Sequence, residues 1–136
     1  MVGPVRSAQG MLAGMSPDLI DGDFIFCTTS DAGLAARAMP AAIGSFREAE
    51  GMSLILPLLD AQALGFDCTA PMRQITLSVY SALDGVGLTA AVASVLAEQV
   101  IPCNMVAAFH HDHVFVPSQM AEAALGHLLA LQAASA

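Results

Sequence analysis

The chain of 136 residues has very few charged side chains. It contains no lysine, its only Arg residues are Arg6, Arg37, Arg47 and Arg73, and its formal net charge at pH 7 is −8. Nucleic acids and anionic membranes are bound through clustered cations, so neither is expected as a partner. Charged residues make up 12% of the chain and hydrophobic residues 56%, whereas ordinary domains carry about a quarter charged residues. A dry interface between subunits would account for this deficit, and we therefore expect a homodimer.

Cysteine is also scarce, and no segment has the pattern of a leader or a membrane span. Cys27, Cys68 and Cys103 are odd in number and lack metal-ligand spacing, so buried reduced thiols are expected. The N-terminal residues are interrupted by glycine and only weakly apolar, unlike a signal peptide. No window reaches the roughly 18 to 20 apolar residues of a membrane span. We expect a cytoplasmic protein.

The two halves of the chain resemble each other. FIFCTTS at Phe24–Ser30 parallels ITLSVYS at Ile75–Ser81, and LILP at 54–57 parallels VFVP at 114–117. The offset between matching motifs grows from 51 to 60 residues along the chain. This difference of nine residues corresponds to about two and a half helical turns. The first repeat is therefore expected to lack its first helix and to carry a loop, Asp31–Ala41, in its place.

The second repeat has a pattern for each of its elements. Alternating apolar and polar residues predict a strand over Ile75–Ser81. A helix is predicted from about Val86 to Gln99, with one large apolar face and one small face that we expect to pack on another helix. The large face is Leu88, Val92, Val95, Leu96 and Gln99, and the small face is Ala90, Ala93, Ser94 and Ala97. A hairpin is predicted between 104–110 and 113–116.

This order of strand, glycine turn, helix, strand, hairpin and strand in Ile75–Pro117 resembles the ACT domain. That βαββαβ module usually binds a free amino acid and regulates an enzyme, and the chain is similar to the paired ACT modules of aspartate kinases. The resemblance implies an α+β fold of two fused ferredoxin-like ACT repeats over about residues 24–131. The predicted parts are an N-terminal segment 1–23, a truncated ACT-like repeat 24–70 and an ACT domain 71–136.

The second repeat ends without a good fourth strand, because Leu131–Ala136 is short and polar at its end. We expect Phe24–Thr29 to supply this strand. Ile75–Ser81 would in turn close the sheet of the first repeat after a helix at Leu58–Phe66. The two repeats would then exchange strands, and neither would fold alone.

The turn Asp84–Leu88 resembles the ACT signature that links the first strand to the first helix. Asp84 can cap the helix, and the glycines allow the backbone to approach a ligand closely. Asn104 lies where ACT modules of the aspartate kinase type hold a polar side chain against a bound amino acid, and its amide can both donate and accept. The predicted ligand-binding residues are Asp84, Gly85, Val86, Gly87, Leu88, Asn104 and Met105. The alternative is a tight turn and a strand start that bind nothing.

Three histidines and an aspartate occur together at residues 110–113. If His111 and Asp112 form a two-residue hairpin loop, His110 and His113 face each other across it and could share a metal with Asp112. Three ligands on a hairpin tip do not make a structural zinc site. A polar hairpin tip is the other interpretation.

No motif of catalysis is present. The sequence has no nucleophile elbow, Walker motif or dinucleotide-binding glycine pattern, so we expect no enzyme activity, no catalytic residues and no cofactor. The resemblance implies a regulatory protein that binds an amino acid and has a regulated enzyme as partner. Two alternatives stay open: a degenerate ACT scaffold that binds only proteins, and a metal-binding protein that uses the histidines.

Overall fold

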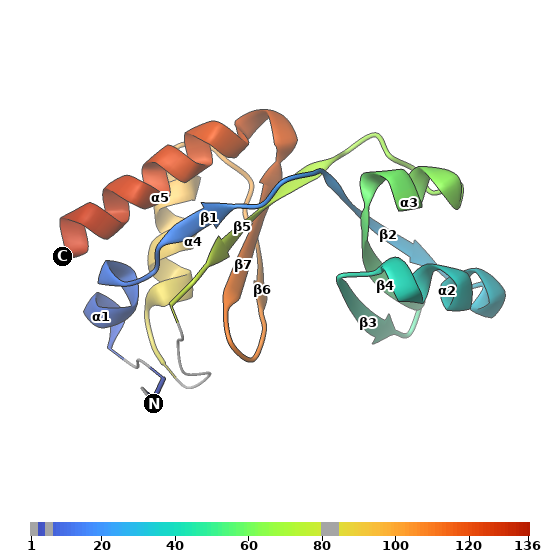
Figure 1. The fold of residues 1–136 in the computed structure, drawn as a ribbon, viewed down its shortest axis with the longest axis horizontal. Helices are drawn as coiled ribbons and strands as arrows, with labels where there is room; N and C mark the ends of the chain where they lie inside the picture. The colour runs from blue at the N-terminus through green and yellow to red at the C-terminus, as the bar shows by residue number, and fades with distance from the viewer. Residues whose placement is uncertain (1–2, 5–6, 80–84) are drawn as a thin grey trace. The chain divides into compact units, whose positions relative to one another are not determined.

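The chain divides into two compact units in the computed structural model, which describes residues 3–4, 7–79 and 85–136 (Figure 1). Unit 1 combines Met1–Ile20 with Gln74–Ala136, and unit 2 is Asp21–Arg73. The N-terminal residues thus belong with the C-terminal part of the chain. The boundaries predicted at residues 24 and 71 stay predictions.

Unit 2 is an antiparallel sheet with its helices on one face. Its strands are β2 (Phe24–Thr29), β3 (Gly44–Glu48) and β4 (Gly51–Pro57), and its helices are α2 (Ala32–Ala38), the 3-10 turn η1 (Met39–Ala41) and α3 (Leu58–Ala63). The strand order is β3-β4-β2, and Phe24 on the other edge of β2 pairs with Met72 at the start of β5 (Met72–Leu77). Taking β5 as the fourth strand gives the order of a ferredoxin-like βαββαβ unit.

The prediction that the first repeat lacks its first helix is wrong. Asp31 caps α2, since its Oδ1 accepts hydrogen bonds from the backbone N of Gly33 at 2.9 Å and of Leu34 at 3.3 Å. Neither Gly33 nor Pro40 interrupts α2, because Gly33 lies in its first turn and Pro40 lies beyond its end. The helix has 7 residues, against 11 in its counterpart in unit 1. The shorter helix accounts for four of the nine residues (11 minus 7), and the connection from the preceding strand to the helix is also shorter in the first repeat.

A close backbone approach fixes the β3–β4 hairpin of unit 2. Glu48 pairs with Gly51, so the turn has two residues. Gly51 has φ +148°, and a Cβ built on it would lie 2.6 Å from the carbonyl oxygen of Thr29. Only glycine fits this position, which holds the hairpin against the end of β2.

Unit 1 has the same arrangement. Its strands are β1 (Pro17–Leu19), the larger part of β5, β6 (Asn104–Ala107) and β7 (Asp112–Pro117). Its helices are α1 (Ala8–Ala13), α4 (Leu88–Glu98), the 3-10 turn η2 (Ser118–Met120) and α5 (Ala121–Ser135). The order is β1-β5-β7-β6, which is again that of a βαββαβ unit when β5 is counted as the first strand. The predicted fold class, two ferredoxin-like repeats, is confirmed.

The predicted exchange of strands is wrong in the residues of both donors. The sheet of unit 2 is closed by Met72 of β5, which lies before the predicted segment Ile75–Ser81. The fourth strand of unit 1 is β1, whose Leu19 pairs with Ile75 and whose Pro17 pairs with Leu77. Phe24–Thr29 instead pairs along its whole length with β4 of its own unit.

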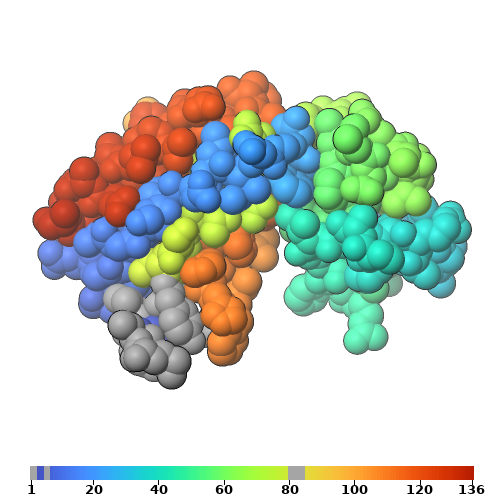
Figure 2. Space-filling view, viewed as in Figure 1, coloured from blue at the N-terminus to red at the C-terminus, as the bar shows by residue number. Residues whose placement is uncertain are grey.

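The N-terminal segment completes the core of unit 1. Met11 and Met15 are buried in one cluster with Leu88, Val92 and Leu96, three residues of the predicted face of α4. The backbone N of Ser78 donates to the carbonyl of Met15 at 2.7 Å, and the Gln132 amide donates to the carbonyl of Ala13 at 3.0 Å. Helices α1 and α5 lie side by side at the surface of this unit (Figure 2).

The small face of α4 is less covered than its large face. Ala90, Ser94 and Ala97 are exposed and Ala93 is half-buried. Packing of this face on another helix stays a prediction.

The contribution of the N-terminal segment to the core can be tested at Met15, which is 0% exposed. Met15→Ala should lower the free energy of unfolding by about 2 to 5 kcal/mol, because it leaves a cavity in the core. Urea unfolding of the full chain measures this change. Met39→Ala, at a methionine that is 38% exposed, is the matched control and should cost under about 1 kcal/mol. Equal losses for the two variants would show that the N-terminal segment is not part of the core.

Candidate functional site

The predicted ligand turn precedes α4 in unit 1. Asp84 lies outside the described residues. Gly87 caps α4 with φ +109°, and its carbonyl accepts a hydrogen bond from the backbone N of Ala91 at 3.0 Å. Leu88 is buried in the core, Gly85 is half-buried and Val86 is 79% exposed. Residues 85–88 are adjacent in the turn, and Leu88 is a core residue of unit 1.

Another part of the same chain, helix α1, closely approaches the backbone of Gly87. A Cβ built on this glycine would lie 2.8 Å from the Cβ of Ala8 in α1. The glycine is therefore needed for packing between α1 and the start of α4. A substitution at Gly87 would disturb this packing and would not report on a ligand.

The predicted lining residues Asn104 and Met105 lie on β6. Asn104 is exposed and pairs with Phe115, whereas Met105 is half-buried and packs on the core. A His111 ring nitrogen at the tip of the β6–β7 hairpin is 3.4 Å from the Val79 carbonyl, which follows the C-terminal end of β5. The hairpin tip therefore lies at the same end of the sheet as the predicted ligand turn. Asn104 begins β6 at the other end, three residues or about 10 Å before Ala107 at the tip. The strands thus separate Asn104 from the turn, and a shared site for the seven residues stays a prediction.

The two-residue loop expected in the histidine cluster is wrong. Ala107 pairs with Asp112 and the Ala108 N donates to the His111 carbonyl at 3.1 Å, so the loop is the four residues 108–111. The segment lacks the Asn-Gly or Asp-Gly pair that is strongly favoured in two-residue hairpin turns.

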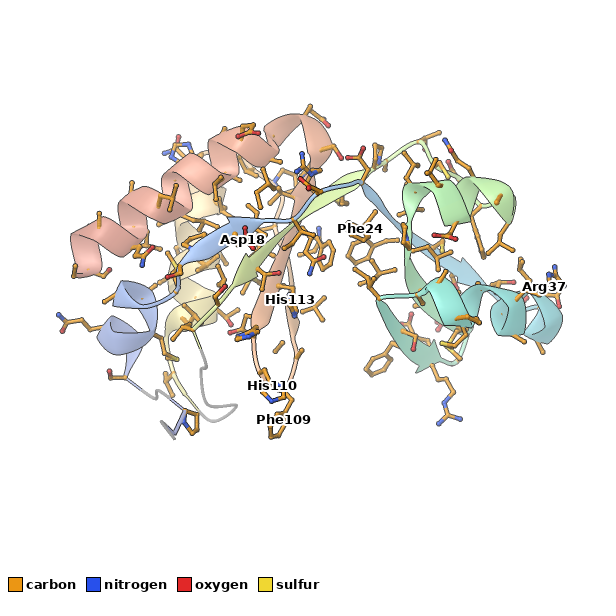
Figure 3. The ribbon with its side chains drawn as sticks, in the orientation of Figure 1. Asp18, Phe24, Arg37, Phe109, His110 and His113 are labelled. Atoms are coloured by element: carbon orange, nitrogen blue, oxygen red, sulfur yellow. The ribbon has the colours of Figure 1, made fainter. Side chains whose placement is uncertain are left out.

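His113 therefore does not face His110. His113 lies opposite Val106, whereas His110 stands in the loop beside Phe109, with ring centroids 5.0 Å apart (Figure 3). The described part of the chain contains no group of three His, Cys, Asp or Glu side chains placed to hold a metal.

His113 joins a polar group on the sheet of unit 1. Its Nδ1 is 3.0 Å from Gln74 Nε2 and 3.1 Å from Thr76 Oγ1. The Gln74 amide nitrogen can only donate, so His113 Nδ1 accepts and the ring is neutral in this arrangement. Burial lowers the pKa of His113 and the neighbouring His111 lowers it further, against an opposing effect of Asp112.

The three cysteines are free and half-buried. Burial raises the pKa of the Cys27 thiol, and the nearby Cys68 raises it further. Burial also raises the pKa of the Cys103 thiol. Cys27 and Cys103 are therefore weak nucleophiles at neutral pH.

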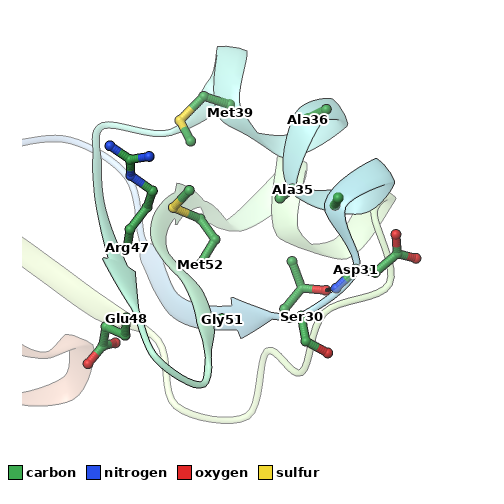
Figure 4. A pocket seen from close by; sticks show the side chains of 11 residues that line it. Ser30, Asp31, Ala35, Ala36, Met39, Arg47, Glu48, Gly51 and Met52 are labelled. Atoms are coloured by element: carbon green, nitrogen blue, oxygen red, sulfur yellow. Dashed lines mark hydrogen bonds between the residues drawn. The ribbon is translucent and has the colours of Figure 1, made fainter.

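Unit 2 contains a cavity that no sequence motif predicted. It has a volume of about 490 Å³ and lies between α2 with η1 and the β3–β4 hairpin (Figure 4). Its lining residues are Thr29, Ser30, Asp31, Ala32, Ala35, Ala36, Met39, Arg47, Glu48, Gly51 and Met52. It follows the first strand of unit 2, so it is the counterpart in this repeat of the predicted turn in unit 1. The signal for it was the Asp31 cap before an alanine-rich segment, which predicts a helix where a loop was expected.

Two parts of the chain match family models of the ACT domain, at residues 4–73 and 69–129. The chain belongs to the ACT domain family. The family agrees with the two βαββαβ units of the structure and with the resemblance found in the sequence. No curated protein matches the chain, and among the helices of the described residues none is long and apolar enough to cross a membrane.

Solved structures similar to this ACT protein include one with high sequence identity. It is a Vibrio cholerae protein of unknown function, called a possible transport protein, with 40% identity and a TM-score of 0.80 over 91% of this chain and 94% of that chain. An Agrobacterium tumefaciens protein is 21% identical, with a TM-score of 0.64 over 85% and 87% of the two chains. The ligand-free regulatory subunit of aspartate kinase from Thermus thermophilus is 12% identical, with a TM-score of 0.61 over 87% and 97%. These last two share the fold.

The pKa of His113 makes stability dependent on pH. The folded-state pKa is lower than the unfolded one, so the unfolded chain binds more protons as the pH falls below about 6.5. Stability from neutral His113 is thus present above the unfolded pKa and lost as the pH falls through the folded pKa. We expect the free energy of unfolding to fall more from pH 7.5 to pH 5 in the unaltered protein than in His113→Gln.

Urea unfolding at the two pH values measures this difference. All other titratable groups are common to both proteins, so the comparison isolates His113. An equal fall in the two proteins would contradict the assignment of a neutral, hydrogen-bonded His113.

Proposed function

We propose that this ACT protein is a non-enzymatic regulatory protein that binds a free amino acid. The observation that carries the proposal is the cavity of unit 2, which opens at the turn between the first strand and the first helix of a complete βαββαβ unit. Its volume lies within the range of small-molecule sites. The likeness of the fold to a regulatory subunit of aspartate kinase supports a regulatory role.

The proposal includes three further features taken from the sequence. They are a cytoplasmic location, a homodimer and a regulated enzyme as partner. The turn at Asp84–Leu88 with Asn104 and Met105 is kept as a second proposed ligand site, although α1 already packs against Gly87.

A scaffold that binds only proteins is the second candidate. One observation favours it: Phe46 is 74% exposed on β3, the edge strand of unit 2. Exposed aromatic side chains on an edge strand suit contact with another protein.

A thermal-shift screen of the full chain with the twenty standard amino acids tests the proposal. A ligand that binds only the native state stabilises it, by about 2.7 kcal/mol at a concentration of one hundred times its Kd. We expect one amino acid, or a chemically related few, to raise the Tm by several degrees in a dose-dependent manner. The D-enantiomer of the responding compound is the control. Silence across the whole set would favour the scaffold.

A further inference from the structure

Arg47 is the single cation of the unit 2 cavity, and its charge is not compensated within the described residues. It lies on β3 opposite Met52 of β4, and its side chain makes no hydrogen bond or ion pair with any residue that the structure describes. Figure 4 shows its guanidinium beside Met39. A guanidinium presents a planar fork of N–H donors that matches a carboxylate.

Both carboxylates of the cavity already have donors. Asp31 Oδ1 accepts from the backbone N of Gly33 and Leu34, and Glu48 Oε1 accepts from Ser53 Oγ. Neither carboxylate neutralises Arg47. Both would repel a second acidic group on a ligand that is held by Arg47.

Apolar side chains form much of the rest of the cavity lining. Ala35 and Ala36 come from α2, Met39 from η1 and Met52 from β4. Met39 is 38% exposed, so part of its apolar surface is open to a ligand. Methionine side chains adapt to the shape of an aliphatic group, whereas a charged group against this wall would lose water without gaining a partner.

We infer that the unit 2 cavity takes a small monocarboxylate with an apolar chain, such as an apolar amino acid, and that Arg47 binds its carboxylate. This inference rests on the proposed function and adds the chemical class of the ligand. The carboxylate lies at Arg47 and the chain lies against the alanines and methionines. Amino acids with acidic or basic side chains bind more weakly.

Calorimetric titration of the full chain tests the inference with L-methionine as the probe. L-methioninol keeps the side chain and the amine but lacks the carboxylate, so it should bind at least about tenfold more weakly. L-glutamate and L-lysine should also bind more weakly than L-methionine. Tighter binding of either charged amino acid would overturn the assigned class.

Two arginine variants locate the carboxylate. Arg47→Gln should weaken L-methionine binding roughly tenfold and leave L-methioninol binding unchanged. Arg37→Gln is the matched control, because Arg37 is an exposed cation on α2 that does not line the cavity. Its affinity for L-methionine should equal that of the unaltered protein. Equal affinities of the two variants would overturn the role of Arg47.

A third variant tests the apolar wall. Ala36 is exposed on α2, so Ala36→Leu occupies part of the cavity without changing the core and should weaken both probes. Undiminished binding in this variant would place the ligand elsewhere.

The outcomes separate the inference from the proposed function. Binding only of amino acids with charged side chains would overturn the inference and leave the proposed function standing. Absence of binding for all twenty would overturn both.

Discussion

The strand β5 has to satisfy the backbone groups of two different neighbours along one edge. Its first residue, Met72, pairs with Phe24 in unit 2, and its last three residues pair with β1 in unit 1. An open sheet edge leaves N–H and C=O groups without partners, so each βαββαβ unit needs a fourth strand. Unit 2 takes this strand from the beginning of β5, and unit 1 takes it from the N-terminal segment.

This need for a fourth strand explains why the N-terminal segment packs into the core of unit 1. Because β1 must lie beside β5, α1 is brought against the helices of unit 1, where Met11 and Met15 enter the core. The same placement puts Ala8 at Gly87, at the start of α4. Gly87 at the start of α4 is thereby packed by the chain itself. The corresponding turn of unit 2 borders a cavity whose arginine has no partner among the residues that the structure describes. Two repeats of one fold thus differ in what their turns can bind.

Much of this fold can be predicted from the residues, because strands with one buried face and helices with one apolar face leave a clear period. Ile75 and Leu77 in β5, and Leu88, Val92 and Leu96 in α4, are buried where that period places them. The strand β1 escaped prediction because three residues that begin with a proline carry no readable period. The helix α2 was missed because a shorter spacing between motifs cannot distinguish a lost helix from a shortened one. The family and the sheet arrangement were therefore predictable, and the donor of one strand was not.

The candidate site was harder to predict, because it depends on side chains that neither pack nor repeat. Arg47 sits in a segment that looks like a solvated strand end, and only the presence of α2 turns that strand end into the wall of a cavity. The histidines show the opposite case: their types suggest a metal, but a four-residue loop places His110 and His113 in different surroundings. Residue type was a poor guide at both positions, because the register of the hairpin decides which side chains meet.

Amide chemical-shift mapping of the ¹⁵N-labelled full chain during titration with L-methionine tests most directly whether the ligand binds in unit 2. We expect shifts in the backbone amides of 29–36 and 47–52, around the cavity. Shifts confined to 85–88 and 104–105 would contradict it, since they would place the ligand at the turn of unit 1.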